Sequence, residues 1–424
     1  MKPKNSPLTP LGALPGPGPL SLPWPILALA ALFLTLIPRA ALAEENITIH
    51  VLTMAPHSDL FTRFGHTALM VEHAATREKK VYNFGEFDYD DPDLMTKALT
   101  GEIQYYLHLM TFRQIERYYK RIGRGLEIQT LHMTDEQKVA LLDMLDEQNL
   151  PENRDYDYRH LTANCCTRVR DLIDGATGGS LSAVNPGADQ TYRDWIDRSL
   201  EPVPLHRIAL AFLLGSPVDR EISRWEEQFY PAVLADHLDR VVNSADGRPL
   251  VEARRIVVET REPEDKGTRY WTHITISVVS SALLLLALAS SIAFPRKRPA
   301  ARLLGLGLFM WGILAGVGGS ALVFLWGMTD HTPTHYNENL LLFPFTHLWL
   351  VVPGLALALK ATLGARTRRL LKVYLIAAIG LALIDFILKM GPFYQANLPF
   401  IAASIVLNTA PFLALSRIKR AAGF

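Results

Sequence analysis

Residues 64–71 read FGHTALMV, and residues 164–171 read NCCTRVRD. The first segment places His66 at the start of an apolar run of the kind that forms a buried strand. The second places Asn164 where a helix N-cap residue belongs, so Cys165 falls in the first turn of a helix. A histidine on a strand and a cysteine at a helix start are the components of a thiol nucleophile and its base. The two segments predict an α+β domain that carries a cysteine–histidine site.

A thiol attacks a carbonyl only as its thiolate. In the first turn of a helix, the dipole and the free backbone N–H groups favour negative charge on Cys165 and can hold a developing oxyanion. A third polar group must orient the histidine ring. Asn83, in the segment YNFG at 82–85, is the candidate for that group, and Glu72, Glu86 and Asp88 compete with it.

The same residues also allow a purely structural interpretation. The chain has two cysteines, Cys165 and Cys166, and neighbouring residues rarely reach disulfide geometry. Each is either a reactive thiol or a small core residue, because Val169, Leu172 and Ile173 follow at helical spacing. Arg168 is either a solvated helix residue or a cationic contact for an acidic or phosphate head group. Asn164, directly before the thiol, is a further candidate for substrate contact.

Residues 44–265 are predicted to form one α+β domain. Strands are expected where apolar residues alternate, and Thr134 with Gln137 three residues later is typical of a helix start. Further helices are expected from Asn164 to about Gly175 and in two later stretches, and a polar linker follows. The predicted strands are 47–53, 67–72 and 80–87, the later helical stretches are 204–214 and 220–242, and the linker is 262–267.

Residues 1–43 are typical of a secretory signal peptide. Lys2 and Lys4 precede a short apolar core at 26–37, and ALA at 41–43 offers a small-residue cleavage site. An uncleaved anchor is the alternative, since Arg39 lies close to the cleavage site.

Residues 266–424 are predicted to form a membrane domain. Five apolar runs are long enough to cross a bilayer, at 274–294, 303–328, 340–359, 371–388 and 398–415. Lys and Arg gather in alternate loops, which places residues 44–270 outside the cytoplasm and the C-terminus inside. The expected location is a cell membrane, with the α+β domain on its extracytoplasmic side.

The loop at 329–339 lies on the same predicted side as the α+β domain. It contains His331 and Asn337, which can complete or roof the thiol site and contact substrate. A solvated loop is the equal alternative.

Composition excludes several other functions. The formal net charge is +1, so no basic excess indicates nucleic acid as a partner. The sequence lacks a phosphate-binding Gly-Lys-Ser/Thr loop and cysteine–histidine spacing for zinc. Neither a metal nor a cofactor is expected.

Several segments, taken in order, resemble the Lnb N-terminal periplasmic domain family. They are LTMAP at 52–56, FTRFGHTA at 61–68, VYNFGEF at 81–87 and NCCTRVRD at 164–171, followed by GSPVDR at 215–220, WE at 225–226 and FYP at 229–231. The resemblance covers about residues 47–240. It implies a fold similar to circularly permuted NlpC-type, papain-like proteins, with His66 as base and Cys165 as nucleophile. Cys166 departs from the pattern, because that position is usually another small residue.

The family is named for an enzyme that moves an acyl chain within the lipidated N-terminal cysteine of bacterial lipoproteins. The resemblance therefore implies a thiol acyltransferase in the inner membrane of a bacterium, with the α+β domain on the periplasmic side, whose substrate is a lipoprotein or a membrane lipid. Two other hypotheses remain open: a cysteine amidase or peptidase that acts on cell-wall peptides, and a non-catalytic membrane binding module.

Overall fold

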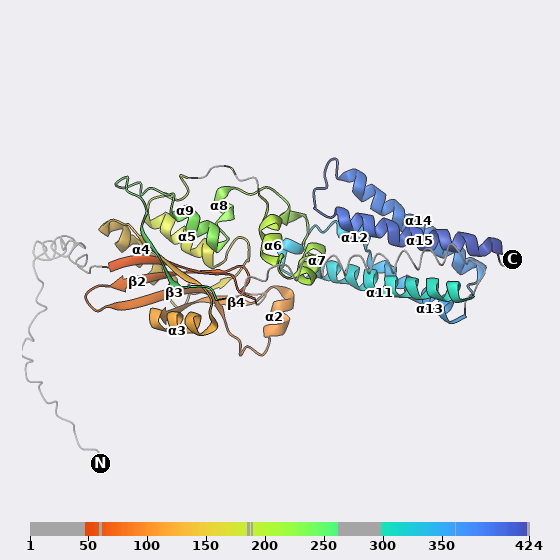
Figure 1. Ribbon diagram of the computed structural model, residues 1–424, viewed down its shortest axis with the longest axis horizontal. Coiled ribbons are helices and arrows are strands. Elements are labelled where there is room, and N and C mark those ends of the chain that lie inside the picture. Colours follow the sequence, from red (N-terminus) through yellow and green to blue (C-terminus); the bar gives the residue numbers. More distant parts are fainter. Residues whose placement is uncertain are drawn as a thin grey trace, which may run out of the picture. The chain divides into compact units, whose positions relative to one another are not determined.

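The computed structural model describes residues 47–58, 62–184, 187, 190–261, 298–360 and 362–421. In this part of the chain a mixed α/β domain precedes four long apolar helices (Figure 1). The predicted signal peptide, the linker at 262–267 and the first predicted span at 274–294 lie outside the described residues.

A seven-stranded antiparallel sheet forms the centre of the α/β domain. Its order is β6-β4-β3-β2-β1-β5-β7. The three strands predicted from the alternating pattern are confirmed as β1, β2 and β3, which pair side by side. The strands are β1 Ile47–Met54, β2 His66–His73, β3 Glu78–Phe87, β4 Gln104–Thr111, β5 Leu126–Leu131, β6 Asp155–Asp157 and β7 Val251–Val258.

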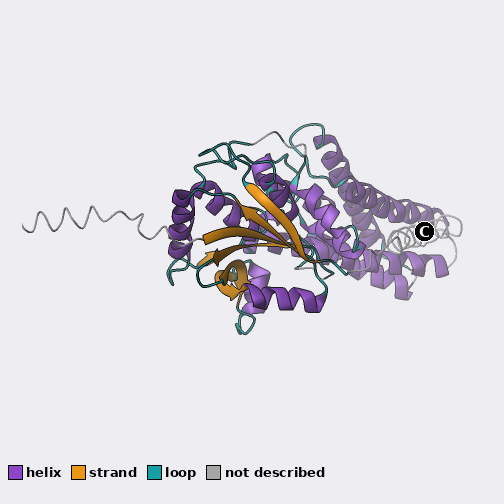
Figure 2. Ribbon diagram, turned by 60° about the vertical axis from the view of Figure 1, so that its left-hand side comes forward, coloured by secondary structure: helices purple, strands orange, loops and turns teal. Residues whose placement is uncertain are grey.

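Helices cover both faces of the sheet (Figures 1 and 2). Alternate side chains of a strand point to opposite faces, so Leu69 joins α4, α5 and α9 in one core, whereas Met70 packs with α3 in another. The helices are α2 Leu94–Thr100, α3 Phe112–Ile122, α4 Asp135–Gln148, α5 Cys165–Ala176, α6 Tyr192–Leu200, α7 Pro204–Leu213, α8 Arg224–Glu227 and α9 Pro231–Leu238, with a 3-10 turn η2 Ser216–Val218.

The predicted helix starts at Thr134 and Asn164 are both confirmed. Each residue caps its helix through a hydrogen bond from the backbone N–H three residues later. The prediction of one helical stretch over 220–242 is wrong, because the chain forms the short α8 and then α9. Tyr230 is extended and Pro231 begins α9, as expected for the residue that precedes a proline.

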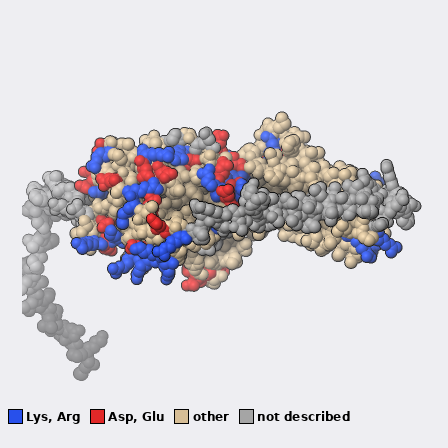
Figure 3. All heavy atoms as spheres, in the orientation of Figure 1, with Lys and Arg blue, Asp and Glu red and all other residues tan. Residues whose placement is uncertain are grey.

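Four of the five predicted spans correspond to helical segments long and apolar enough to cross a membrane: 298–328, 339–360, 365–388 and 398–416. In Figure 3 acidic side chains gather over the α/β domain, and the visible face of these helices shows few charges. The elements are α11 Arg298–Met328, η3 Thr332–Thr334, α12 Asn339–Leu342, η4 Phe345–Leu350, α13 Val351–Lys360, α14 Ala365–Leu388 and α15 Leu398–Ala421.

Candidate active site

Cys165 is the first residue of α5, and Asn164 fixes the turn before it. The Asn164 side chain accepts a hydrogen bond from the Thr167 N–H at 3.0 Å and donates to the carbonyls of His160 and Phe229 at 2.8 and 2.9 Å. All the polar atoms of this amide are therefore engaged in holding the loop against the helix start. Asn164, a predicted substrate contact, thus holds the turn that positions Cys165.

His66 is the first residue of β2, and Asn83 lies behind its ring on β3. The Asn83 oxygen Oδ1 lies 2.6 Å from Nε2 of His66. The Asn83 nitrogen Nδ2 donates to Glu86 at 2.6 Å, which orients the amide with its oxygen toward the histidine. Glu86, one of the three alternatives to Asn83, therefore hydrogen-bonds to Asn83 and acts on His66 only through it.

The other two alternatives engage different partners. Glu72 binds His50 at 3.2 Å and Lys79 at 2.8 Å, at the far end of β2 from His66. Asp88 accepts a hydrogen bond from the backbone of Asp90.

The thiol and the imidazole stabilise each other's charge. A hydrogen bond from Cys166 holds the pKa of the Cys165 thiol well below its usual range, against the effect of burial, and the charge and hydrogen bond of His66 and the backbone N–H of Thr67 act in the same direction. Burial opposes protonation of His66, but the charge of Cys165 and its hydrogen bond outweigh burial and raise the pKa of the ring. These shifts favour a thiolate–imidazolium pair.

Cys166 occupies a different environment from Cys165. It is fully buried, and its Sγ lies 4.0 Å from Sγ of Cys165 and 3.3 Å from Oγ1 of Thr67. Burial and the neighbouring Cys165 raise the pKa of its thiol well above the usual range. Cys166 is thus a protonated donor to its neighbour, whereas Cys165 carries the negative charge.

An aromatic wall stands beside Cys165. A Cβ built on Gly85, whose φ is +96°, would lie 3.2 Å from Cε2 of Tyr158, 3.8 Å from Cβ of Cys165 and 3.9 Å from the hydroxyl of Tyr156. The Tyr156 side chain is buried, and within the described residues its hydroxyl has no hydrogen-bond partner. The guanidinium of Arg168 lies 4.4 Å from the centre of the Tyr156 ring, so Arg168 is at the border of the site.

The loop at 329–339, predicted as a possible roof of the thiol site, contacts the α/β domain at two points. His331 donates a hydrogen bond to the Ala98 carbonyl on α2 at 3.0 Å. Asn337 is buried, and its amide donates to the carbonyls of Phe212 and Leu213 at 3.0 and 2.9 Å. The structure therefore holds His331 against α2, whereas the Asn337 amide is engaged at the end of α7.

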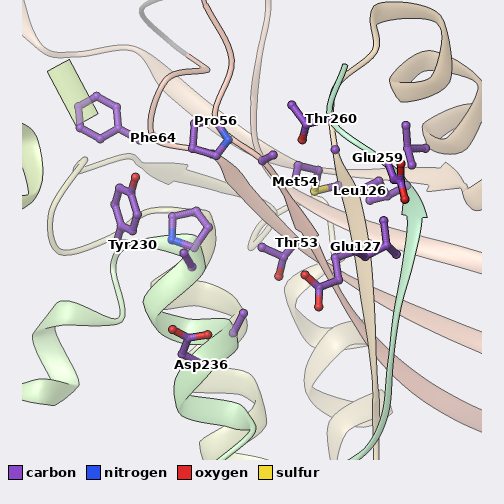
Figure 4. A pocket seen from close by; sticks show the side chains of 18 of the residues that line it. Thr53, Met54, Pro56, Phe64, Leu126, Glu127, Tyr230, Asp236, Glu259 and Thr260 are labelled. Atoms are coloured by element: carbon purple, nitrogen blue, oxygen red, sulfur yellow. The ribbon is translucent and has the colours of Figure 1, made fainter. Parts of the chain in front are cut away.

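A cavity of about 520 Å³ lies at the end of the sheet where β2 begins with His66 (Figure 4). Phe64 and Gly65 line it, directly before His66, but neither His66 nor Cys165 does. Its other walls combine apolar side chains such as Met54 and Pro231 with acidic ones such as Glu127. Across the described ranges, no group of three His, Cys, Asp or Glu side chains is placed to hold a metal ion.

Comparison with protein-family models identifies the part of the chain that holds this arrangement. Residues 37–198 match the Lnb N-terminal periplasmic domain, and this span includes His66, Asn83 and Cys165. Comparisons with curated proteins and with solved structures gave no match. With four long apolar helices among the residues that the structure describes, the chain is a multi-pass membrane protein with a periplasmic segment. The part of the chain that carries the cysteine–histidine pair is therefore similar to the Lnb N-terminal periplasmic domain.

Proposed function

We propose that the protein is a membrane-bound thiol acyltransferase that acts on acyl esters of lipoproteins or phospholipids. Cys165 is the nucleophile, His66 is the base and then the acid, and Asn83 orients the histidine ring. The observation that carries the proposal is the charge pattern of the pair: the pKa of Cys165 is lowered and that of His66 is raised, while Asn83 accepts a hydrogen bond from the ring. A structural cysteine in a core has no need of such partners.

The reaction takes place in two steps. The Cys165 thiolate attacks the ester carbonyl, so that a C–S bond forms, the C–O bond breaks, and the alcohol leaves with a proton from His66. An acceptor amine or hydroxyl then attacks the thioester, gives its proton to His66, and releases Cys165 as thiolate. The backbone N–H groups at the start of α5 are the donors for the oxyanion formed in each step.

The membrane domain supports a lipid ester as substrate. Acyl chains leave a bilayer reluctantly, at about 0.8 kcal/mol for each CH₂ transferred to water. An enzyme anchored by long apolar helices avoids that transfer. The contact between His331 and α2 supports a location of the loop at 329–339 on the same side of the membrane as the α/β domain. That relation supports a periplasmic domain at 44–265, a membrane domain at 266–424 and a cytoplasmic C-terminus in the inner membrane.

The fold proposed for the periplasmic domain is the permuted NlpC-type, papain-like arrangement. Its support is the order along the chain, in which the strand histidine precedes the cysteine at the helix start.

The test compares Cys165→Ala and Cys166→Ala with the parent protein, with the acyl pattern of cellular lipoproteins read by mass spectrometry. We expect Cys165→Ala alone to abolish one lipoprotein modification, because Cys166 is fully buried and protonated. Unchanged lipoproteins in both variants would refute the acyltransferase. Release of stem-peptide fragments from cell wall would then identify a cysteine amidase or peptidase, and no reaction with either substrate would identify a binding module.

A further inference from the structure

Helix α7 carries an apolar stripe that stays exposed among the described residues. Leu205, Ile208 and Phe212 recur at helical spacing. Leu205 is 74% exposed and Ile208 is 50% exposed. Single exposed apolar residues are ordinary, but a stripe of them along one helix marks an interaction surface.

The third member of the stripe, Phe212, packs into the membrane domain. Its ring lies 5.3 Å from that of Phe343 and 5.6 Å from that of Phe400. The carbonyls at the end of α7 accept hydrogen bonds from Asn337 and, through Leu214, from Gln395. The stripe is thus continuous with the apolar helices at Phe212 and exposed at Leu205.

A second exposed apolar surface, on α2, is held by the same loop. Met95 is 73% exposed and Leu99 is 56% exposed. The carbonyls of Ala98 and Thr100 on α2 accept hydrogen bonds from His331 and Asp330. Two segments of the α/β domain that are about a hundred residues apart in the sequence therefore attach to one loop between two apolar helices.

Aromatic side chains place this loop at the membrane surface. Trp326 lies two residues before the end of α11, and its ring lies 5.4 Å from that of Tyr336, which is itself 64% exposed. Trp and Tyr concentrate at the level of the lipid head groups. His331 follows the end of α11 by three residues, which limits its distance from that end to about 10 Å. Helix α2 is therefore within reach of the head-group layer, which is roughly 5–8 Å deep on each side.

We propose that α7 and α2 form a membrane seat, defined by Leu205, Ile208, Met95 and Leu99, that inserts into the outer boundary between the head groups and acyl chains of the bilayer crossed by the apolar helices. The partner is the phospholipid layer itself. If the proposed function holds, the seat also brings the thiol site to the lipid surface, but the seat stands independently of that function.

The experiment uses the full chain in nanodiscs of phosphatidylcholine and phosphatidylglycerol. Cys165→Ala and Cys166→Ala remove both native cysteines, and single cysteines at 205, 208, 95 and 99 then carry a nitroxide label. Leu150→Cys is the matched control, because Leu150 is 44% exposed at the end of α4. The readout is the ratio of label collisions with oxygen, which concentrates in lipid, to collisions with a water-soluble nickel complex.

We expect the ratio to be several-fold higher at the four seat positions than at position 150. Equal ratios at 205, 208 and 150 would overturn the proposal. All labelled positions are exposed, so the labels leave the packing intact, and matching thermal melts of the labelled variants check this. Because the readout contains no catalytic step, it gives the same answer whether or not Cys165 is a nucleophile.

Discussion

The amide oxygen of Asn83 lies 2.6 Å from Nε2 of His66. An amide oxygen only accepts hydrogen bonds, so Nε2 of the ring carries the proton. The Asn83 nitrogen is committed to Glu86, which prevents the amide from turning round. The remaining ring nitrogen, Nδ1, is the one left for Cys165. Asn83 therefore keeps a proton on Nε2 of His66 and leaves Nδ1 to exchange a proton with the thiol.

Asn83→Ala is expected to raise the pKa of Cys165. The hydrogen bond from His66 to Asn83 helps to raise the pKa of the ring, and the protonated ring in turn helps to lower that of the thiol. The rate of alkylation by iodoacetamide, followed against pH, should therefore show its midpoint at higher pH. Asn153→Ala, at an exposed turn, is the control and should leave the midpoint in place. The same midpoint in both variants would contradict a role for Asn83 in charging the pair.

The two cysteines are expected to behave in opposite ways toward the same reagent. Cys165→Ala should abolish labelling at neutral pH, because the pKa of Cys166 is raised and its side chain is fully buried. Cys166→Ala should keep the labelling but move its midpoint to higher pH, since the hydrogen bond from Cys166 is the largest influence that lowers the pKa of Cys165. Peptide mapping by mass spectrometry identifies the labelled thiol. Labelling that survives Cys165→Ala would reverse the roles of the two residues.

The sequence predicted the parts of this fold whose causes are local. Alternating apolar residues marked β1 to β3, and Asn164 marked the start of α5 through a capping pattern that acts over three residues. Strand β7 was missed, because most of its side chains are exposed at the sheet edge and leave no alternating pattern.

The surroundings of the thiol could be predicted only in part. Asn83 was foreseen because it lies on the strand next to His66, which a hairpin brings alongside. Tyr156 and Tyr158 were missed, because β6 reaches the site only through its pairing with β4 across about fifty residues of sequence. The division of the two thiols into a charged and a protonated one also depends on Thr67, which contacts both from β2.

Tyr156→Phe is expected to stabilise the protein. The hydroxyl is buried and has no hydrogen-bond partner within the described residues. An unsatisfied buried polar group costs about 1–3 kcal/mol, and a phenylalanine ring still stacks under Arg168. The melting temperature in detergent should rise by a few degrees, whereas Tyr118→Phe, at a half-exposed side chain, should leave it unchanged. A fall on Tyr156→Phe would mean that the hydroxyl makes a stabilising contact.

Gly85→Ala is expected to damage the site more than an equivalent glycine change elsewhere. Gly85 has φ of +96°, and Gly178, just beyond α5, has φ of +64°. Alanine in a left-handed conformation costs about 1–2 kcal/mol at either position. At Gly178 a new Cβ meets no atom of the described residues within 4 Å, but at Gly85 it lies 3.2 Å from Tyr158.

Tyr158 has little room to yield, because its ring stacks on Tyr105 at 4.3 Å. The strain at Gly85 is therefore relieved toward Cys165, whose Cβ lies 3.8 Å from the new methyl group. Both variants should lower the melting temperature, but only Gly85→Ala should also slow alkylation of Cys165 at neutral pH. Equal alkylation rates in the two variants would mean that the wall beside Cys165 can move without disturbing the thiol.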